Sequence, residues 1–291
     1  MSRNRKKVCV IGGSNADITA TTLQDFVAND SNPGKVRITP GGVARNIAHN
    51  LALLGNEVVF LTLFPDDVFG RFTAESCRNA GIDISHCDLA LRGKHSCFVS
   101  INNRDGEMIG GVSDMMAVDD ITPSWLAQKL SKIGPVDVLV ADANLPVEAL
   151  AFLIDITKAP LYMDAVSSAK AGRIKEAMER SKKKHIHTLK CNRLEAATLS
   201  DIEGVDRFIV SLGADGIEVH EGQETQRFPA LPSEVANATG AGDALMAGLI
   251  HAGPEASVKE AARIGLRCAK IAVETPDVVN TNLRQRYAEL S

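Results

Sequence analysis

Residues 237–250 read Asn-Ala-Thr-Gly-Ala-Gly-Asp-Ala-Leu-Met-Ala-Gly-Leu-Ile. Gly240 and Gly242 flank Ala241 and let the backbone turn tightly and approach a ligand closely. An apolar helix follows, and backbone N–H groups at the start of a helix converge on an anion, which the helix dipole also favours. Asp243 stands in the first turn of this predicted helix, so its carboxylate can accept a proton from an attacking hydroxyl group beside a bound phosphoryl group. Taken alone, the segment fits a catalytic turn and an ordinary capped glycine turn equally well.

A second glycine-rich stretch precedes the first predicted helix. Gly41 and Gly42 allow close backbone approach, and Asn46 follows in the first helical turns, where its amide can donate to and accept from sugar hydroxyl groups. Asn15 and Asp17 follow the first predicted strand, and ligands of open α/β sheets lie beyond the carboxyl ends of the strands. A carboxylate at that place suits a vicinal diol. Together with the C-terminal turn, these residues favour a hydroxyl-bearing substrate over a set of ordinary loops.

Short β-branched runs alternate with helical patterns along the chain. Residues 43–54 place apolar side chains on one helical face, and Gly55 is a natural helix stop. Such alternation predicts a mostly parallel sheet covered by helices on both faces. The runs predicted as buried strands are Val8–Ile11, Val58–Leu63, Val136–Ala141, Leu161–Met163, His185–Leu189 and Phe208–Leu212.

Two segments break this alternation. Residues 15–40 are polar and contain the turn signal Asn32-Pro33-Gly34, and residues 94–112 alternate like antiparallel strands around a polar tip at 102–106. We expect the two segments to pair into a small sheet that acts as a lid. Since no repeat, low-complexity tract or linker occurs, the sequence predicts one α/β domain over 1–291 with the lid, 15–40 and 94–112, inserted in it.

Composition argues against several classes of partner. The 291 residues are 45% hydrophobic and 23% charged, which is typical of a globular chain. Aromatic residues make up 4% and the net charge is −4, so no nucleic-acid partner is expected. No apolar run approaches the roughly 18 residues of a membrane span, so no membrane partner is expected either. The six cysteines are scattered without a paired motif, which predicts reduced thiols and a cytoplasmic location.

Two further motifs lie between the glycine-rich stretches. They are Asn192-x-x-Glu195 and Ser211-Leu-Gly-Ala-Asp-Gly216, placed between Gly41-Gly42…Asn46…Gly55 and Thr239-Gly-Ala-Gly-Asp243. In this order and separation, the four motifs resemble the signatures of the PfkB/ribokinase family of carbohydrate and nucleoside kinases. The resemblance runs from Cys9 to the C-terminus. It implies an α/β fold: a ribokinase-like, Rossmann-type three-layer sandwich, in which a mostly parallel sheet is flanked by helices, with a small β-sheet lid.

The resemblance also implies a role for each matching residue. Asp243 would be the catalytic base that activates a substrate hydroxyl, and the backbone of Gly240, Ala241 and Gly242 would form the anion hole. The sugar would be held by Asp17, Gly41, Gly42 and Asn46. The residues serving ATP would be Asn192, Glu195, Ser211, Gly213, Gly216, Thr239 and Asn280. Glu195 would also organise Mg²⁺, through water.

Departures from the family pattern bear on the cation and the substrate. The family commonly has an Asp of a monovalent-cation site where this chain has Asn237, which argues against activation by K⁺. Sugar kinases of the family often carry Asp-x-Asn-x-Arg where this chain reads Asp164-Ala-Val-Ser-Ser-Ala-Lys170. This segment, with residues 41–55 and 141–145, looks like the branch that phosphorylates pseudouridine. The implied reaction is ATP-dependent phosphorylation of the 5′-hydroxyl group of pseudouridine, which gives pseudouridine 5′-phosphate and ADP.

The residues alone do not identify the base of the nucleoside. A C-nucleoside uracil offers one more N–H donor than uridine, and a site built to pair with it would reject uridine. Asn15, Asn144 and Ser167 carry groups suited to reading the base. The alternatives are a kinase for another nucleoside or for a free sugar such as ribose or fructose, and a non-catalytic nucleoside-binding sensor. An exposed lid face could pair with a second subunit, so we expect a homodimer through the lid.

Overall fold

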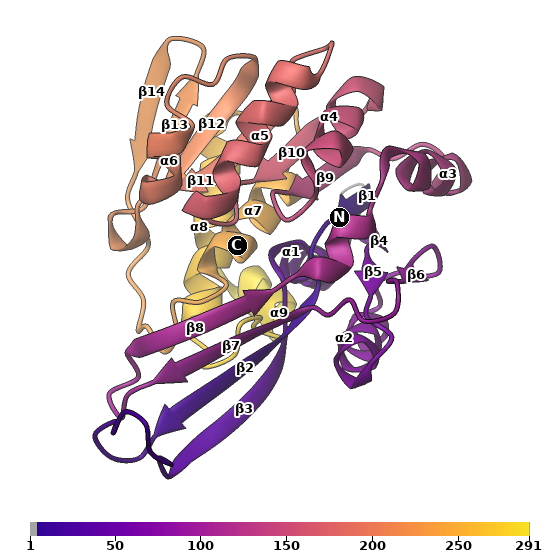
Figure 1. The fold of residues 1–291 in the computed structure, drawn as a ribbon. Helices are drawn as coiled ribbons and strands as arrows, with labels where there is room; N and C mark the ends of the chain where they lie inside the picture. Colours follow the sequence, from indigo (N-terminus) through magenta and orange to yellow (C-terminus); the bar gives the residue numbers. More distant parts are fainter. Residues whose placement is uncertain (1–4, 291) are drawn as a thin grey trace.

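A large sheet forms the centre of the computed structural model, which describes residues 5–290; residues 1–4 and 291 of the expected 1–291 domain lie outside it. Its strands are β1 (Lys7–Ile11), β4 (Glu57–Leu61), β9 (Val138–Asp142), β10 (Leu161–Asp164), β11 (Ile186–Asn192), β12 (Val205–Ser211), β13 (Ile217–Glu221) and β14 (Glu224–Phe228). Their order is β14-β13-β12-β11-β10-β9-β1-β4 (Figure 1). From β4 to β12 neighbouring strands are parallel, and β13 and β14 extend one edge as an antiparallel hairpin.

This sheet confirms the predicted fold class, with two differences. All six predicted runs contain a strand, but Val58–Leu63 does not form a single one, so that prediction is wrong in its extent. The strand β4 ends at Leu61, and β5 (Leu63–Phe64) pairs instead with β6 (Asp88–Leu89) in a separate two-stranded sheet. The β13–β14 hairpin is absent from the sequence prediction because charged residues interrupt its apolar positions, which hides the strand pattern.

Helices cover both faces of the sheet (Figure 1). One face carries α3 (Pro123–Ile133), α4 (Val147–Ile156), α5 (Ser168–Arg180) and α6 (Arg193–Thr198). The other carries α1 (Val43–Leu53), α2 (Val68–Asn79), α7 (Ala241–Ala252) and α8 (Val258–Val273), and α9 (Leu283–Glu289) packs against α8. Two short 3₁₀ helices are η1 (Met116–Asp120) and η2 (Gly213–Asp215). None of the helices in residues 5–290 combines the length and apolar character that crossing a membrane requires.

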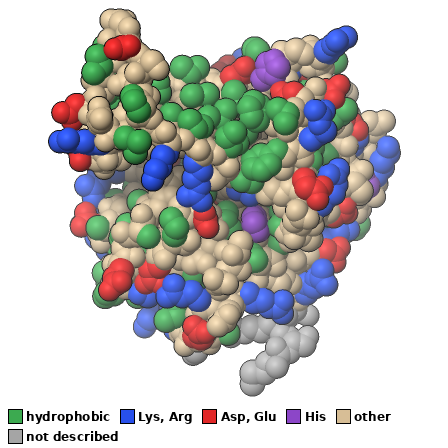
Figure 2. Space-filling view, turned by 90° about the horizontal axis from the view of Figure 1, so that it is seen from below, with side chains coloured by type: hydrophobic (Ala, Val, Ile, Leu, Met, Phe, Trp, Pro, Cys, Tyr) green, Lys and Arg blue, Asp and Glu red, His purple; other side chains and the backbone are tan. Residues whose placement is uncertain are grey.

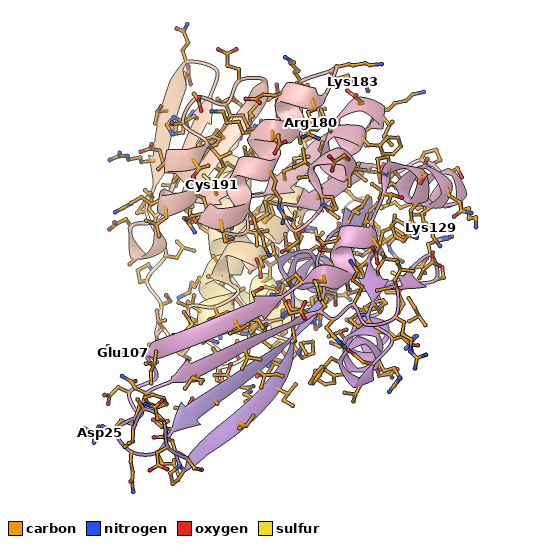
Figure 3. All side chains as sticks on the ribbon, viewed as in Figure 1. Asp25, Glu107, Lys129, Arg180, Lys183 and Cys191 are labelled. Atoms are coloured by element: carbon orange, nitrogen blue, oxygen red, sulfur yellow. The ribbon has the colours of Figure 1, made fainter. Side chains whose placement is uncertain are left out.

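The lid segments form a second sheet of four strands. These are β2 (Asn15–Thr22), β3 (Gly34–Gly41), β7 (Cys97–Asn102) and β8 (Met108–Asp114), in the order β3-β2-β7-β8. We call them the lid sheet; they extend the segments 15–40 and 94–112 by one and two residues, to Gly41 and Asp114. The sheet projects from the main body, with Asp25 and Glu107 near its free end (Figure 3).

One face of the lid sheet is apolar and open. The register aligns Ile38, Ile18, Val99 and Val112 in one row across all four strands. Successive side chains of a strand point to opposite faces, so Asp17 and Thr19 lie on the opposite, polar face. Val112 is 70% exposed. The view from below, the side on which the lid sheet lies in Figure 1, shows hydrophobic side chains gathered on this part of the surface (Figure 2).

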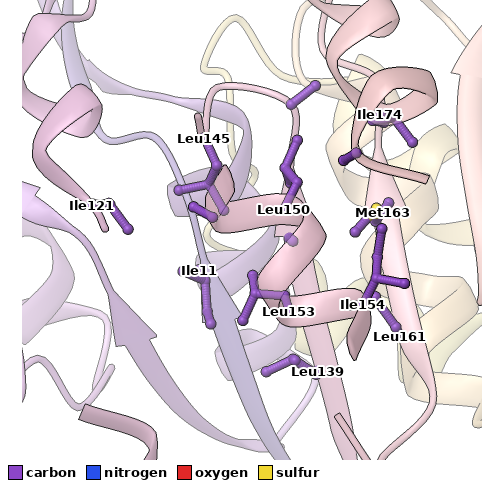
Figure 4. Close-up of a cluster of buried hydrophobic side chains, with 14 of the residues drawn as sticks. Ile11, Ile121, Leu139, Leu145, Leu150, Leu153, Ile154, Leu161, Met163 and Ile174 are labelled. Atoms are coloured by element: carbon purple, nitrogen blue, oxygen red, sulfur yellow. The ribbon is translucent and has the colours of Figure 1, made fainter. Parts of the chain in front are cut away.

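The core explains why the main sheet is stable. In β1, Cys9 and Ile11 point to one helical layer while Val8 and Val10 point to the other, and all four are fully buried. On the first side, Leu150 and Leu153 of α4 pack among side chains of the strands below them (Figure 4). Each fully buried aliphatic side chain contributes about 1.5–3 kcal/mol. This packing holds the carboxyl ends of the strands, where the predicted site residues lie.

Candidate active site

Asp243 is positioned by the first turn of α7. Gly240 precedes the helix in the left-handed conformation (φ 83°), and a Cβ there would lie 2.1 Å from the carbonyl oxygen of Val278. Only glycine fits such a place without strain. Within residues 5–290 no side chain caps this helix, which leaves N–H groups of its first turn suited to binding an anion.

The Asp243 carboxylate is buried and contacts the opposite side of the site. It is 8% exposed, and Asn46 Nδ2 on α1 donates to its Oδ2 at 2.7 Å. Burial raises the pKa of Asp243 to about 7, and the Asp164 carboxylate adds to the rise. Lys190, Asn46 and Arg45 oppose this rise. A carboxylate that titrates near neutral pH is suited to general base catalysis.

A buried lysine that the sequence analysis missed stands beside the same turn. Lys190 Nζ donates to Asp164 Oδ2 at 2.9 Å, and a Cβ on Gly242 would lie 2.7 Å from Lys190 Nζ. Burial alone would lower the pKa of Lys190, but the carboxylates of Asp164, Asp243 and Glu195 outweigh it and raise that pKa. The ammonium group is therefore charged, and it lies beside the Gly240–Gly242 turn. The predicted strand ended at Leu189; extending it by one residue would have placed Lys190 at the ligand edge of the sheet.

A cavity of about 710 Å³ opens beside the turn. This volume is typical of small-molecule sites. Of the predicted residues it is lined by Asn192, Ser211, Gly213, Gly216, Ala241 and Gly242. Its apolar wall includes Ile217, Leu245, Leu266 and Val273. The structure thus brings the predicted nucleotide-binding loop, the Asn192 motif and the turn before α7 together around one cavity.

Three predicted nucleotide residues lie outside this lining. The Thr239 N–H donates to Asn237 Oδ1 at 2.9 Å, within the turn itself. Asn280 is buried, and its Nδ2 donates to the carbonyl oxygen of Ile271 at 2.8 Å, which uses its amide within the fold. Glu195 forms a capping box with Asn192: its Oε2 accepts from the Asn192 N–H at 2.8 Å. These three residues make hydrogen bonds within the fold and do not line the cavity.

A larger cavity elsewhere carries none of this chemistry. It measures about 830 Å³ and lies between α6 and the β13–β14 hairpin. Its charged residues already pair with one another, as Arg227 does with Glu218. Gly242 and Ala241 line the 710 Å³ cavity and not this one, so the smaller cavity is the candidate active site.

On the other side of Asp243 lies the end of the lid sheet nearest the main sheet, residues 15–17 and 40–42, which we call the lid root. It gathers the predicted sugar residues. Asn15 Nδ2 donates to Asp17 Oδ1 at 2.6 Å, and burial raises the pKa of Asp17. A Cβ on Gly41 would lie 2.1 Å from Asp17 Oδ2, and one on Gly42 (φ 97°) would lie 2.4 Å from the carbonyl oxygen of Gly13. Both glycines are therefore required for the chain to pass this close to the carboxylate.

Asn144 and Ser167 belong to a neighbouring network. Asn144 Nδ2 donates to Asp142 Oδ2 at 2.8 Å, and Lys170 Nζ donates to Asn144 Oδ1 at 2.5 Å. Ser167 begins α5, and its hydroxyl makes no capping hydrogen bond in the described chain. Val166 before it has φ 65°, a strained value for a β-branched residue, and such strain clusters at functional sites. Both ends of the Asn144 amide are used, whereas the Lys170 ammonium group has further N–H donors available for a ligand. The sequence analysis did not select Lys170 for the site.

Metal-binding side chains are sparse near this site. Among residues 5–290 no group of three or more His, Cys, Asp or Glu is placed to hold a metal ion. Asn192 lines the cavity, and Glu195 pairs with it through both carboxylate oxygens, so these two residues suit contact with Mg²⁺ through water.

Comparison with known proteins agrees with this geometry. The family model described as pfkB family carbohydrate kinase matches residues 5–285. Pseudouridine kinase of Escherichia coli (strain K12) is 33% identical over 302 residues, which cover 97% of this chain and 95% of that protein. An uncharacterized sugar kinase of the same organism is 31% identical over 96% of this chain and 81% of that protein.

Solved structures show the same fold. A carbohydrate kinase from Agrobacterium tumefaciens has a TM-score of 0.82 at 30% identity, covering 98% of this chain and 96% of that one. Arabidopsis thaliana ribokinase, complexed with ribose and ATP, has a TM-score of 0.81 at 16% identity over 99% of both chains. At that identity the second likeness shows the fold alone. The family model matches almost the whole of this chain. This chain therefore belongs to the pfkB family of carbohydrate kinases and is a phosphotransferase with an alcohol group as acceptor.

Proposed function

We propose that this protein transfers the γ-phosphoryl group of ATP to the 5′-hydroxyl group of pseudouridine. The observation that carries the proposal is the buried Asp243 carboxylate, which lies at the N-terminus of α7 between the 710 Å³ cavity and the lid root. The 33% identity to a pseudouridine kinase along 97% of the chain supports the substrate. The products are pseudouridine 5′-phosphate and ADP.

The geometry supports in-line transfer. ATP would occupy the cavity with its γ-phosphate toward the Gly240–Gly242 turn, where N–H groups and the Lys190 ammonium offset negative charge. Asp243 accepts the proton of the 5′-hydroxyl as the new P–O bond forms and the bond to the β,γ-bridging oxygen breaks. Mg²⁺ bound with ATP would neutralise phosphate charge, held through water by Asn192 and Glu195. The lid sheet would close over the substrates and exclude water, which suppresses ATP hydrolysis.

The substrate side uses the lid root. Asp17, Gly41, Gly42 and Asn46 would hold the ribose, with Asp17 accepting from its vicinal hydroxyls. Asn15, Asn144 and Ser167 remain our candidates for reading the base, and Lys170 adds a donor for a base carbonyl. A site that pairs the additional N–H of the C-nucleoside would reject uridine, whose base leaves that partner unpaired.

A substrate panel tests this proposal. Ribose, fructose, adenosine, guanosine, uridine and pseudouridine are offered with ATP and Mg²⁺, and kcat/KM is measured for each. We expect pseudouridine to exceed uridine by at least about 100-fold. A higher kcat/KM for ribose, fructose or another nucleoside would overturn the substrate while leaving the kinase family intact. Binding of pseudouridine with no phosphate transfer to any of these substrates would instead favour a nucleoside sensor.

We further propose that the protein works in the cytoplasm as a homodimer. All six cysteines are free thiols, which suits a reducing compartment. The open apolar face of the lid sheet, with Val36 at 68% and Val112 at 70% exposure, is suited to a second copy.

A further inference from the structure

Arg45 is a buried cation that none of the roles above uses. It lies on α1, is 2% exposed, and follows the Gly41-Gly42 turn directly in the fold. One guanidinium nitrogen donates to the carbonyl oxygen of Pro40 at 2.7 Å and also to Asn46 Oδ1, and the other meets His49 Nδ1 at 3.3 Å. Burial and the neighbouring guanidinium lower the pKa of His49 to about 4, so the ring is neutral and accepts the hydrogen bond. The planar group is therefore held from three directions.

The Asn46 amide stands between two groups of opposite hydrogen-bonding character. A guanidinium group only donates, and an ionised carboxylate only accepts. Asn46 Oδ1 accepts from Arg45, and Asn46 Nδ2 donates to Asp243 Oδ2 at 2.7 Å. Turning the amide by 180° would set its NH₂ against the guanidinium and its oxygen against the carboxylate. Only one orientation satisfies both neighbours, and Arg45 selects it.

We propose that Arg45 is a positioning residue that fixes the Asn46 amide toward Asp243 and ties this contact to the lid root at Pro40. The inference deepens the proposed function, since it concerns the same base. A hydrogen bond to the ionised form of a carboxyl group favours that form. The fixed amide therefore keeps more of Asp243 ionised, and able to accept a proton, at neutral pH.

Several charged groups surround Asp243 and affect its pKa, so the test must change the orientation of the Asn46 amide without changing these charges. Asp164 faces it from β10 and Lys190 from β11, while Arg45 and Asn46 face it from α1. Replacing Arg45 with lysine keeps the positive charge but removes the planar fork, which reaches His49 with one nitrogen and Pro40 and Asn46 with the other. The variant Arg45→Lys therefore separates orientation of the amide from the electrostatic effect of a cation.

The experiment follows the titration of Asp243 directly, in the full chain. Aspartate is labelled with ¹³C at its carboxyl carbon, and Asp243→Asn assigns the Asp243 signal. Titrations are compared for wild type, Arg45→Lys, Asn46→Ala and the double variant. We expect the Asp243 midpoint to rise by roughly half to one pH unit in each single variant. We expect the double variant to match Asn46→Ala, because Arg45 acts through Asn46. Arg78→Lys, an exposed arginine paired with Glu75, serves as the matched control and leaves the midpoint unchanged.

Kinetics supply the second readout. The acidic limb of kcat/KM in Arg45→Lys should move to higher pH, so that the loss is several-fold at pH 6.5 and recovers at pH 8.5. An unchanged midpoint in Arg45→Lys, or an equal shift with and without Asn46, would overturn the proposal. If Arg45→Lys fails to fold, Arg45→Gln is titrated with and without Asn46; it keeps an amide donor toward Asn46 but removes the charge, so a shift of the same size in both backgrounds would overturn the proposal. Full turnover in Asp243→Asn would refute the base itself, whereas the NMR comparison needs no turnover, so the two failures are distinguishable.

Discussion

The ionised form of Asp243 is the one that can act as a base, but its burial lowers the stability of the fold. Its pKa of about 7 in the fold exceeds the ordinary 3.8, so the stability associated with its protonated form is present below about pH 4 and is lost as pH rises through 7. We predict that Asp243→Asn lowers kcat by about 10²–10⁴-fold. The same variant should be more stable than wild type at pH 8, on the order of a few kcal/mol, and the difference should vanish toward pH 4. Thermal unfolding at both pH values measures this.

A second buried aspartate provides the control. Asp142 is fully buried and burial raises its pKa too, but its carboxylate also accepts from the N–H groups of Gly13 and Ala44, at 3.1 and 3.0 Å for Oδ2. Asp142→Asn leaves fewer acceptors for these donors, so this variant should lose stability at pH 8. A loss of stability in Asp243→Asn at pH 8 would mark Asp243 as structural, and unchanged turnover would remove it as the base.

Lys190 is the other residue whose role rests on a buried charge. We predict that Lys190→Met lowers kcat by about 10²–10³-fold, because a cation beside the anion-binding turn is lost. It should also destabilise the fold by about 3–5 kcal/mol, since it leaves Asp164 buried without its partner. The double variant Asp164→Asn/Lys190→Met removes both charges and should recover much of the stability but none of the turnover. Steady-state kinetics and denaturant titration separate the two effects; normal kcat in a folded Lys190→Met would contradict the assignment.

At the scale of elements, the sequence could predict the parts of the site that neighbouring residues form, but not the parts that distant segments bring together around α7. The Gly240–Asp243 turn was predictable because a helix start and its N–H groups are formed by neighbouring residues. Arg45 and Lys190 were not, because a charged residue within a helix or at a strand end usually lies at the surface. Their burial depends on Asp164, Asn46 and Asp243, which other parts of the chain supply.

The turn before α7 also bears on the monovalent cation. Asn237 Nδ2 donates to the carbonyl oxygen of Pro276 at 3.1 Å, and its Oδ1 accepts from the Thr239 N–H at 2.9 Å. An N–H group thus points at the Pro276 carbonyl oxygen, and an N–H group cannot ligate a cation, so we expect no K⁺ site there. We predict equal kcat/KM in potassium and sodium buffers. In Asn237→Asp a carboxylate replaces the N–H donor and faces the Pro276 carbonyl oxygen, so that two acceptors meet. A cation can bridge them, and we therefore expect the activity of this variant to fall without K⁺ and to return when K⁺ is added. Activation of the wild-type protein by K⁺ would contradict this.

At the scale of the whole molecule, the parallel sheet was predictable and its edge was not. Strands buried along nearly their whole length, such as β1 and β9, read as nearly continuous apolar runs. The β13–β14 hairpin covers less of the core, so its mixed pattern resembles a surface loop. The lid sheet lies between these cases: its two segments were identifiable from turn signals, but its order β3-β2-β7-β8, with β2 parallel to β7, required the fold.

The lid sheet also sets the expected assembly of the molecule. Ile38, Ile18, Val99 and Val112 align on one face, and burying that face against a second copy would remove its apolar surface from water. We predict a dimer at micromolar concentration by light scattering, which becomes a monomer in Val112→Lys because a buried ammonium is costly. The monomer should bind the nucleoside more weakly, since the opposite face of the same sheet carries Asp17 at the lid root. Glu107→Lys, a charge change near the free end of the sheet, is the control and should leave the dimer intact (Figure 3). A wild-type monomer, or a dimer that survives Val112→Lys, would place the interface elsewhere.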